Sequence, residues 1–431
     1  MELAERRRGD RIPRWLRWGL GTFALCVLLS VGVYEYQRYQ IRAIYAEMRS
    51  HDWPTNQEEL EEYGQLPPGA VDNSQVWVPA ITSADAAIKS AKLPDPRAPF
   101  GYDPPVPGQP WEHQPETEEF LQKLVPYLEA LHRAAESGGR ARFPNGTHVD
   151  SRSVGYLLYL ESKTAAYHGD SQRRLKAIKS LLALSNIMEG EARSIIIMSF
   201  RAIHDFGATE AIGQINTGAS KDHDIAELQR LICSVDLHAE CQGFQFDEMI
   251  SMVEFIQEES RIPFHPANEL ELLRHCSNTR PSFLLPWPEM LKELENADAY
   301  WNELPSRQWI EPFRFRSLSP RLNFNSFARL MALSAAKQAC ANGILAAERF
   351  RLRHGKLPAS MVAIDADLFA KLPGGTIPLT DPMDGQPLRF RLDADGLRIY
   401  SVSFNGVDDG GDILSDSKQI PLDAGYLLKT R

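Results

Sequence analysis

The residues best suited to chemistry lie near the C-terminus, in the stretch from Asn405 to Asp412 (NGVDDGGD). Four of its side chains offer oxygen ligands, those of Asn405, Asp408, Asp409 and Asp412, and the glycines between them let backbone carbonyls turn inward. A hard cation that takes six to eight oxygen ligands suits this set, and calcium is the natural candidate. Asp, Asn and Gly are also the common residues of a solvated turn, so the spacing leaves both interpretations open.

Two smaller groups could also do chemistry. His238 and Cys241 are spaced i, i+3 on an expected helix, which supplies two soft ligands of the four that zinc needs. Arg201, His204 and Asp205 share another expected helix, and a histidine beside a carboxylate can act as a base. Both groups can equally have only a structural role in their helices. Because the chain lacks the G-x-S-x-G, P-loop, H-E-x-x-H and C-x-x-C patterns, the sequence names no catalytic residue.

The cysteines allow more than one arrangement. Cys26 lies in an apolar N-terminal segment, and the other four are Cys233, Cys241, Cys276 and Cys340. On one helix Cys233 and Cys241 would be about 12 Å apart, beyond the roughly 7 Å limit for a disulfide. Any bridge must therefore include Cys276 or Cys340, and buried reduced thiols are the alternative.

Most of the chain has helical periodicity. From Glu116 onward apolar residues recur at intervals of three and four, as in Phe120, Leu124 and Leu131. Gly and Pro clusters separate the helical stretches, and no fixed period identifies a repeat family. We expect an all-α bundle or an irregular solenoid here.

The last eighty or so residues change character. Gly355 to Pro358 ends a long helix, and residues 388–392 and 397–402 alternate as strands do. Asp393 to Gly396 is a hairpin turn between them. These features predict a long helix packed on a small antiparallel sheet.

An apolar segment follows six arginines at the N-terminus, and it predicts a membrane anchor. The segment from Trp18 to Tyr34 would span about 26 Å as a helix, and Trp15, Trp18 and Tyr36 can sit at the two interfaces. The arginine-rich tail favours the cytoplasm, which places the bulk of the chain in the periplasm, outside an inner membrane. A cleavable signal peptide fits the same flanks, but the small-residue cleavage pattern is poor.

The overall fold class is therefore mainly α, with an N-terminal transmembrane helix, the helical bundle or solenoid, and a C-terminal α+β module. The expected divisions are a cytoplasmic basic tail (1–17), a transmembrane helix (18–35), an extracytoplasmic connector with a proline-rich segment (36–115), a helical domain (116–324) and the α+β module (325–431).

The net charge of −10 bears on the partners. A surface of this sign repels phosphate backbones, and no basic stripe with interleaved aromatic residues is present. We expect no nucleic-acid partner, and we expect a membrane contact and a protein or peptide partner.

The C-terminal segments together resemble a known family. Residues 348–358 (ERFRLRHGKLP), 381–390 (DPMDGQPLRF), 400–402 (YSV) and the loop from Asn405 to Asp412 follow one another as in the globular part of the major pseudopilin of type II secretion systems. The resemblance implies that this loop binds calcium, with Asn405, Asp408, Asp409 and Asp412 as the ligand counterparts. The family's leader is not present, and Asn405 stands where the family loop begins with aspartate.

A broader resemblance is to large anchored proteins of planctomycete-type bacteria. It covers the entry from Trp53 to Pro68, the helical middle and the same ending, and it implies an architecture without an activity. The leading hypothesis is a non-enzymatic, membrane-anchored extracytoplasmic scaffold that binds a protein or peptide in its helical part. The alternatives are an accessory component of a secretion or envelope machine, and a hydrolase with dispersed residues around Arg201, His204 and Asp205.

Overall fold

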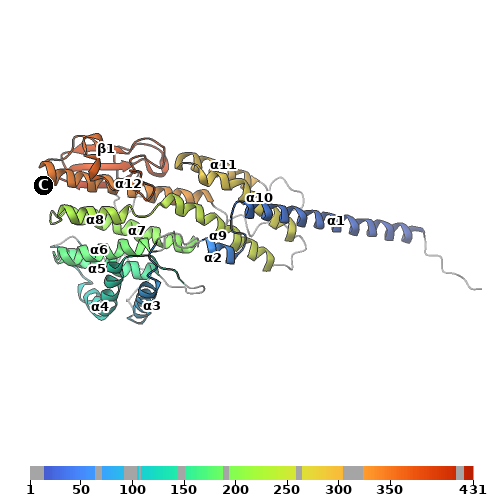
Figure 1. Cartoon of the computed structure of the whole chain (residues 1–431), viewed down its shortest axis with the longest axis horizontal. Helices are drawn as coiled ribbons and strands as arrows, with labels where there is room; N and C mark the ends of the chain where they lie inside the picture. The colour runs from blue at the N-terminus through green and yellow to red at the C-terminus, as the bar shows by residue number, and fades with distance from the viewer. Residues whose placement is uncertain are drawn as a thin grey trace, which may run out of the picture.

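The computed structural model describes residues 14–63, 70–91, 104–105, 108–143, 151–187, 194–258, 265–303, 324–413 and 422–430. It is an elongated, mainly helical body from which one long helix projects (Figure 1). The predicted proline-rich stretch from Leu93 to Trp111 lies mostly outside the described residues.

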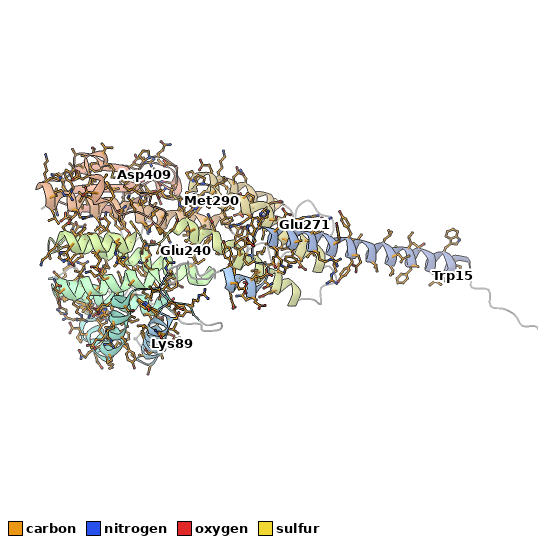
Figure 2. The ribbon with its side chains drawn as sticks, viewed as in Figure 1. Trp15, Lys89, Glu240, Glu271, Met290 and Asp409 are labelled. Carbon is orange, nitrogen blue, oxygen red and sulfur yellow. The ribbon has the colours of Figure 1, made fainter. Side chains whose placement is uncertain are left out.

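The projecting helix is α1 (Arg14–Ser50), whose apolar part is fully exposed. It is long and apolar enough to cross a membrane, and Figure 2 shows Trp15 standing clear of the body at its outer end. Its last turns are buried against the body, with Ile41 and Met48 in the core. The Tyr45 hydroxyl donates a hydrogen bond of 3.0 Å to Glu269 Oε1. The helix α1 therefore continues into the body without a break.

The body next to α1 is one apolar cluster. Besides the end of α1, it contains residues from α2 (Gln57–Tyr63), α9 (Leu237–Glu258), α10 (His265–Thr279), η2 (Arg280–Leu284), α11 (Trp287–Glu303) and the start of α12 (Phe324–His354). Asn56 caps α2, because its Oδ1 accepts from Glu59 N at 2.9 Å. Glu59 in turn accepts from Thr55 N at 2.8 Å.

The far side of the body is a helical bundle with its own core. It comprises α3 (Ser74–Ala91), α4 (Gln114–Ser137), α5 (Ser151–Tyr167), α6 (Ser171–Asn186) and α7 (Ser194–Ile215). The helices α3 and α4 lie at the edge farthest from the sheet, while α6 and α7 lie toward the middle of the molecule (Figure 1).

The helix α12 joins the parts of the body. Its central residues are buried all round, because α7, α8 (Asp222–Ile232), α9 and the sheet pack against it. Gly343 permits one close approach, since a Cβ there would lie 3.0 Å from Ile399 Cδ1. The residues of α12 belong to two of the three apolar clusters, so the C-terminal module shares its core with the helical part.

The sheet packs on one side of α12 and has the order β1-β2-β3, all antiparallel. The strands are β1 (Arg389–Asp393), β2 (Gly396–Ser401) and β3 (Ala424–Lys429), and the short helices η5 (Met361–Ala363), η6 (Ala366–Leu368) and η7 (Ser403–Asn405) lie in the connections. Asn216 covers the outer edge of β3, because its amide donates to Leu427 O and accepts from Lys429 N, each at 2.9 Å.

The coarse fold prediction is confirmed: a mainly helical chain with an apolar N-terminal helix and a small antiparallel sheet near the C-terminus. The predicted hairpin is present, with Asp393 paired to Gly396. The third strand, β3, was not predicted. The domain boundaries at 115 and 324 stay predictions.

Candidate functional site

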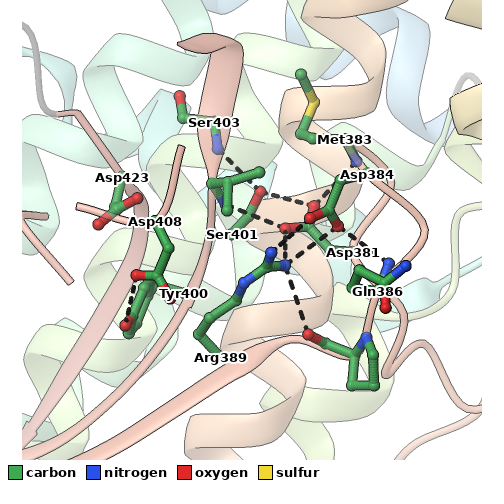
Figure 3. Close-up of polar contacts among 12 residues, drawn as sticks. Asp381, Met383, Asp384, Gln386, Arg389, Tyr400, Ser401, Ser403, Asp408 and Asp423 are labelled. Atoms are coloured by element: carbon green, nitrogen blue, oxygen red, sulfur yellow. Dashed lines mark hydrogen bonds and ion pairs between the residues drawn. The ribbon is translucent and has the colours of Figure 1, made fainter. Parts of the chain in front are cut away.

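The predicted calcium loop follows β2 and η7, and its residues Asp409 and Asp408 are labelled in Figures 2 and 3. Asp408 Oδ1 accepts from the Tyr400 hydroxyl at 3.0 Å and from Gly410 N at 2.9 Å. Burial and the neighbouring Asp408 raise the pKa of Tyr400 to about 12. Asn405 Nδ2 donates to Asp409 Oδ2 at 2.6 Å. These bonds fix the loop from within.

A fourth acidic group, missed in the sequence, belongs to the same loop. Asp423 is 1% exposed and accepts backbone N–H groups of Gly411 at 2.8 Å, Asp412 at 3.1 Å and Asp409 at 3.4 Å. Its burial raises its pKa, and the three backbone N–H groups offset part of that effect. Asp423 therefore closes the loop onto the start of β3.

The four predicted ligands, Asn405, Asp408, Asp409 and Asp412, are all exposed. Among the described residues, no group of three or more His, Cys, Asp or Glu side chains is arranged to hold a metal ion. The calcium site stays a prediction of the sequence, with Asp423 as an additional carboxylate at its base.

Beneath the loop, Asp381 is the centre of a buried polar network (Figure 3). Its Oδ1 accepts from Ser401 Oγ at 2.7 Å and from Met383 N at 2.9 Å, and its Oδ2 accepts from Val402 N at 3.0 Å. Arg389 Nη1 lies 3.0 Å from Oδ2 and also pairs with Asp384. The network fastens the turn from 381 to 386 to the end of β2. It has a structural role, since every bond is internal and Asp381 is fully buried.

The predicted base site around His204 is tightly packed. His204 Nε2 lies 3.0 Å from Ile232 O, and Arg201 Nη1 donates to Ser334 Oγ at 3.0 Å. Asp205 Oδ2 pairs with Lys337 Nζ at 3.3 Å. The space beside His204 and Arg201 is about 20 Å³, room for about one water molecule. The three residues lie together as predicted, and a substrate-sized space does not accompany them.

The two zinc candidates, His238 and Cys241, contact the protein interior. His238 Nε2 lies 2.8 Å from Leu285 O, and Cys241 is fully buried. All five cysteines are free thiols, and burial raises the pKa of Cys233 to about 12 and raises those of Cys241 and Cys276 further. Such thiols are small hydrophobic groups, the alternative that the sequence left open.

A larger hollow lies elsewhere, between α4, α6 and α8, with a volume of about 630 Å³. Its floor includes the turn after α4, which pairs with the segment before α3 through the bridge between Asp72 and Arg140. Gly139 has φ +74°, and a Cβ there would lie 2.8 Å from Val71 O, so only glycine fits this crossing. The sequence signal was the Gly138-Gly139 pair, which we interpreted only as a helix end.

Cationic side chains dominate the hollow. It is lined by Arg140, Lys176, Lys179 and Arg230 and by the two carboxylates Glu136 and Glu227. Lys179 pairs with Glu227, and Lys176 lies 3.9 Å from Glu136. Arg230 is exposed and forms no ion pair with any residue that the structure describes. The lining thus carries four cations and two carboxylates, and a third carboxylate, Asp224, lies 3.6 Å from Lys179. The remaining excess of positive charge, in a chain of net charge −10, can attract an anionic group.

No protein-family model, no curated protein and no solved structure matches this chain.

Proposed function

We propose that the protein is a single-pass, membrane-anchored binding protein whose helical body captures an anionic protein segment or peptide in the hollow between α4, α6 and α8. The observation that carries this proposal is the cationic lining of a hollow of about 630 Å³ on an otherwise acidic chain. That volume lies within the usual range of about 300 to 1,000 Å³ for ligand sites. Apolar residues such as Leu231 and Ala183 in the same lining suit a ligand that also has aliphatic groups.

We place the body in the periplasm and the N-terminus in the cytoplasm. The argument is the arginine-rich tail before the apolar part of α1, which the positive-inside rule retains in the cytoplasm. Since α1 is one continuous helix and Ile41 is already buried, only about six residues separate the apolar run from the body. At about 1.5 Å per residue, the body is held within roughly 10 Å of the membrane.

The test is a titration of the full-length protein in lipid nanodiscs with a fluorescein-labelled peptide of alternating glutamate and leucine, followed by fluorescence anisotropy. We expect saturable binding that weakens as salt is added, because exposed charges are screened over about 8 Å at physiological ionic strength. The double variant Lys176→Ala, Arg230→Ala should raise the Kd about tenfold, which corresponds to about 1.4 kcal/mol.

The matched control removes the same charge from α4 outside the hollow. Lys123 and Arg133 are exposed and pair only with neighbours on their own helix, Glu119 and Glu129. The double variant Lys123→Ala, Arg133→Ala should leave the Kd within twofold of the native value. Absence of saturable binding, or equal weakening in both double variants, contradicts the proposed site.

A second element of the proposal is that calcium binds the loop from Asn405 to Asp412 and stabilises the C-terminal module. Supporting it are the resemblance to the pseudopilin loop and the concentration of carboxylates from Asp408 to Asp412, with Asp423 buried beneath them. A cation there would reduce the mutual repulsion of these groups.

A further inference from the structure

A serine, a histidine and a glutamate from three different helices lie in one line in the core of the bundle. His132 of α4 has its Nδ1 2.7 Å from Ser180 Oγ of α6, and its Nε2 3.1 Å from Glu161 Oε2 of α5. All three are nearly fully buried, at 5%, 2% and 5% exposure for His132, Ser180 and Glu161. Serine hydrolases hold a nucleophile, a base and an orienting carboxylate at such distances, with the serine at Nε2 and the carboxylate at Nδ1 of the histidine. In this bundle the two ring nitrogens have exchanged partners.

The charges determine which way the serine proton points. Glu161 is held by Arg173, whose Nε donates to Glu161 Oε1 at 3.1 Å. The carboxylate beside Nε2 favours the tautomer with its proton on Nε2, which leaves the lone pair of Nδ1 facing Ser180. Ser180 then donates to His132, as a nucleophile does to its base. The contact between Nε2 and Glu161 has hydrogen-bond distance without full alignment, and such contacts commonly tighten when a substrate binds.

Ser180 also borders the hollow between α4, α6 and α8. It is one of the lining residues, and Lys176 lies one helical turn before it on the same face of α6. Ser180 is only 2% exposed but adjoins the hollow, so a substrate whose negative charge is held by the cationic lining lies next to the serine. The same positive charge can stabilise an oxyanion that develops beside Ser180.

We propose that Ser180 is the nucleophile of an acyl hydrolase, with His132 as general base and Glu161 as the positioning residue, acting on esters that carry an anionic group. Ser180 Oγ attacks the acyl carbon, and its proton passes to His132 Nδ1 and then to the leaving alcohol. Water attacks the acyl-serine through the same base, which releases the carboxylic acid and restores the serine proton. This inference rests on the proposed function only in that the hollow must admit a ligand.

The first test is labelling of the full-length protein in nanodiscs with a fluorophosphonate probe, which reacts with activated serines. We expect one labelled serine, identified as Ser180 by peptide mass spectrometry. The variant Ser180→Ala should lose the label. Ser185→Ala, a control in the same helix whose hydroxyl donates to Leu182 O, should keep it. Absence of labelling in the native protein, or labelling that survives in Ser180→Ala, overturns the proposal.

The role of His132 needs a readout that a merely structural residue would not change. His132→Ala should lower the labelling rate at least a hundredfold, the usual scale of general-base catalysis. Added imidazole should then restore part of the rate by occupying the vacated space. If labelling is unaffected in His132→Ala, or if imidazole rescues nothing in a variant that keeps its circular dichroism spectrum, His132 is not the base.

A final comparison separates this proposal from the binding function. Mono-4-nitrophenyl glutarate should be hydrolysed with a kcat/KM at least tenfold above that of the neutral 4-nitrophenyl acetate, and Lys176→Gln should reduce this ratio. Ser180→Ala should abolish both hydrolyses. Peptide binding without hydrolysis of either ester refutes the hydrolase and leaves the binding function. Hydrolysis without peptide binding refutes the binding function and leaves the hydrolase.

Discussion

Replacing Asp381 with alanine should destabilise the C-terminal module strongly. The substitution leaves the N–H groups of Met383 and Val402 and the hydroxyl of Ser401 without their acceptor, and the last two are buried. Each unsatisfied buried donor costs about 1 to 3 kcal/mol, and Arg389 loses its fully buried partner as well. We expect a loss of about 3 to 5 kcal/mol in the free energy of unfolding, the scale for breaking a buried ion pair.

The assay is equilibrium urea unfolding of the full-length protein in detergent micelles, followed by circular dichroism. Asp384→Ala is the matched control, because Asp384 pairs with the same arginine but is partly exposed. Arg389 lowers the pKa of Asp384, yet the solvated pair should contribute only about 1 kcal/mol or less. If Asp381→Ala is no more destabilising than Asp384→Ala, the reasoning from unsatisfied donors is wrong.

Three further predictions concern acid, calcium and thiols. Burial lowers the pKa of His275 to about 4, below the value of about 6.5 in an unfolded chain. The free energy of unfolding is therefore highest above pH 6.5, where the histidine is neutral in both states, and it falls as the pH drops toward 4, because the unfolded chain binds the proton more readily. Urea unfolding at pH 7 and pH 4.5 should show a loss of up to about 3 kcal/mol, smaller in His275→Phe, and an equal loss in both proteins contradicts this. Saturating calcium should raise the unfolding free energy by about 2.7 kcal/mol at a hundred times its Kd, an effect abolished in Asp412→Ala, and identical melting in calcium and in chelator removes the calcium site. Ellman's reagent should find the four buried cysteines unreactive in the native protein and all five thiols free in unreduced, denatured protein, and a lower denatured count means that disulfides form.

Local patterns account for most of what was predicted. The helices follow from apolar residues at intervals of three and four, and the hairpin from Asp393 to Gly396 follows from alternation around a turn. The strand β3 was not predicted, because apolar and polar residues alternate only weakly in its six positions and because it pairs with β2 across a connection of more than twenty residues. Asp423 was missed for the same reason, since its partners in the loop lie eleven to fourteen residues away.

The chemistry of the bundle could not be predicted from spacing. His132 and Ser180 are 48 residues apart, and Glu161 lies between them on another helix. Each occupies one face of its own helix, where a lone polar residue has no pattern to mark it. Only the packing of α4, α5 and α6 brings them within hydrogen-bond distance. In contrast, Arg201, His204 and Asp205 formed a visible group in the sequence, and the structure fills the space around them.

The most direct test of the central claim, that the cationic hollow is the binding site, is amide hydrogen exchange of the full-length protein in nanodiscs with and without the acidic peptide. The account predicts slower exchange in the segment before α3, in the turn after α4 from 138 to 140 and around Arg230 at the end of α8, with no change in the loop from Asn405 to Asp412. Slower exchange confined to that loop or to the sheet, or no change anywhere at a saturating peptide concentration, would contradict it.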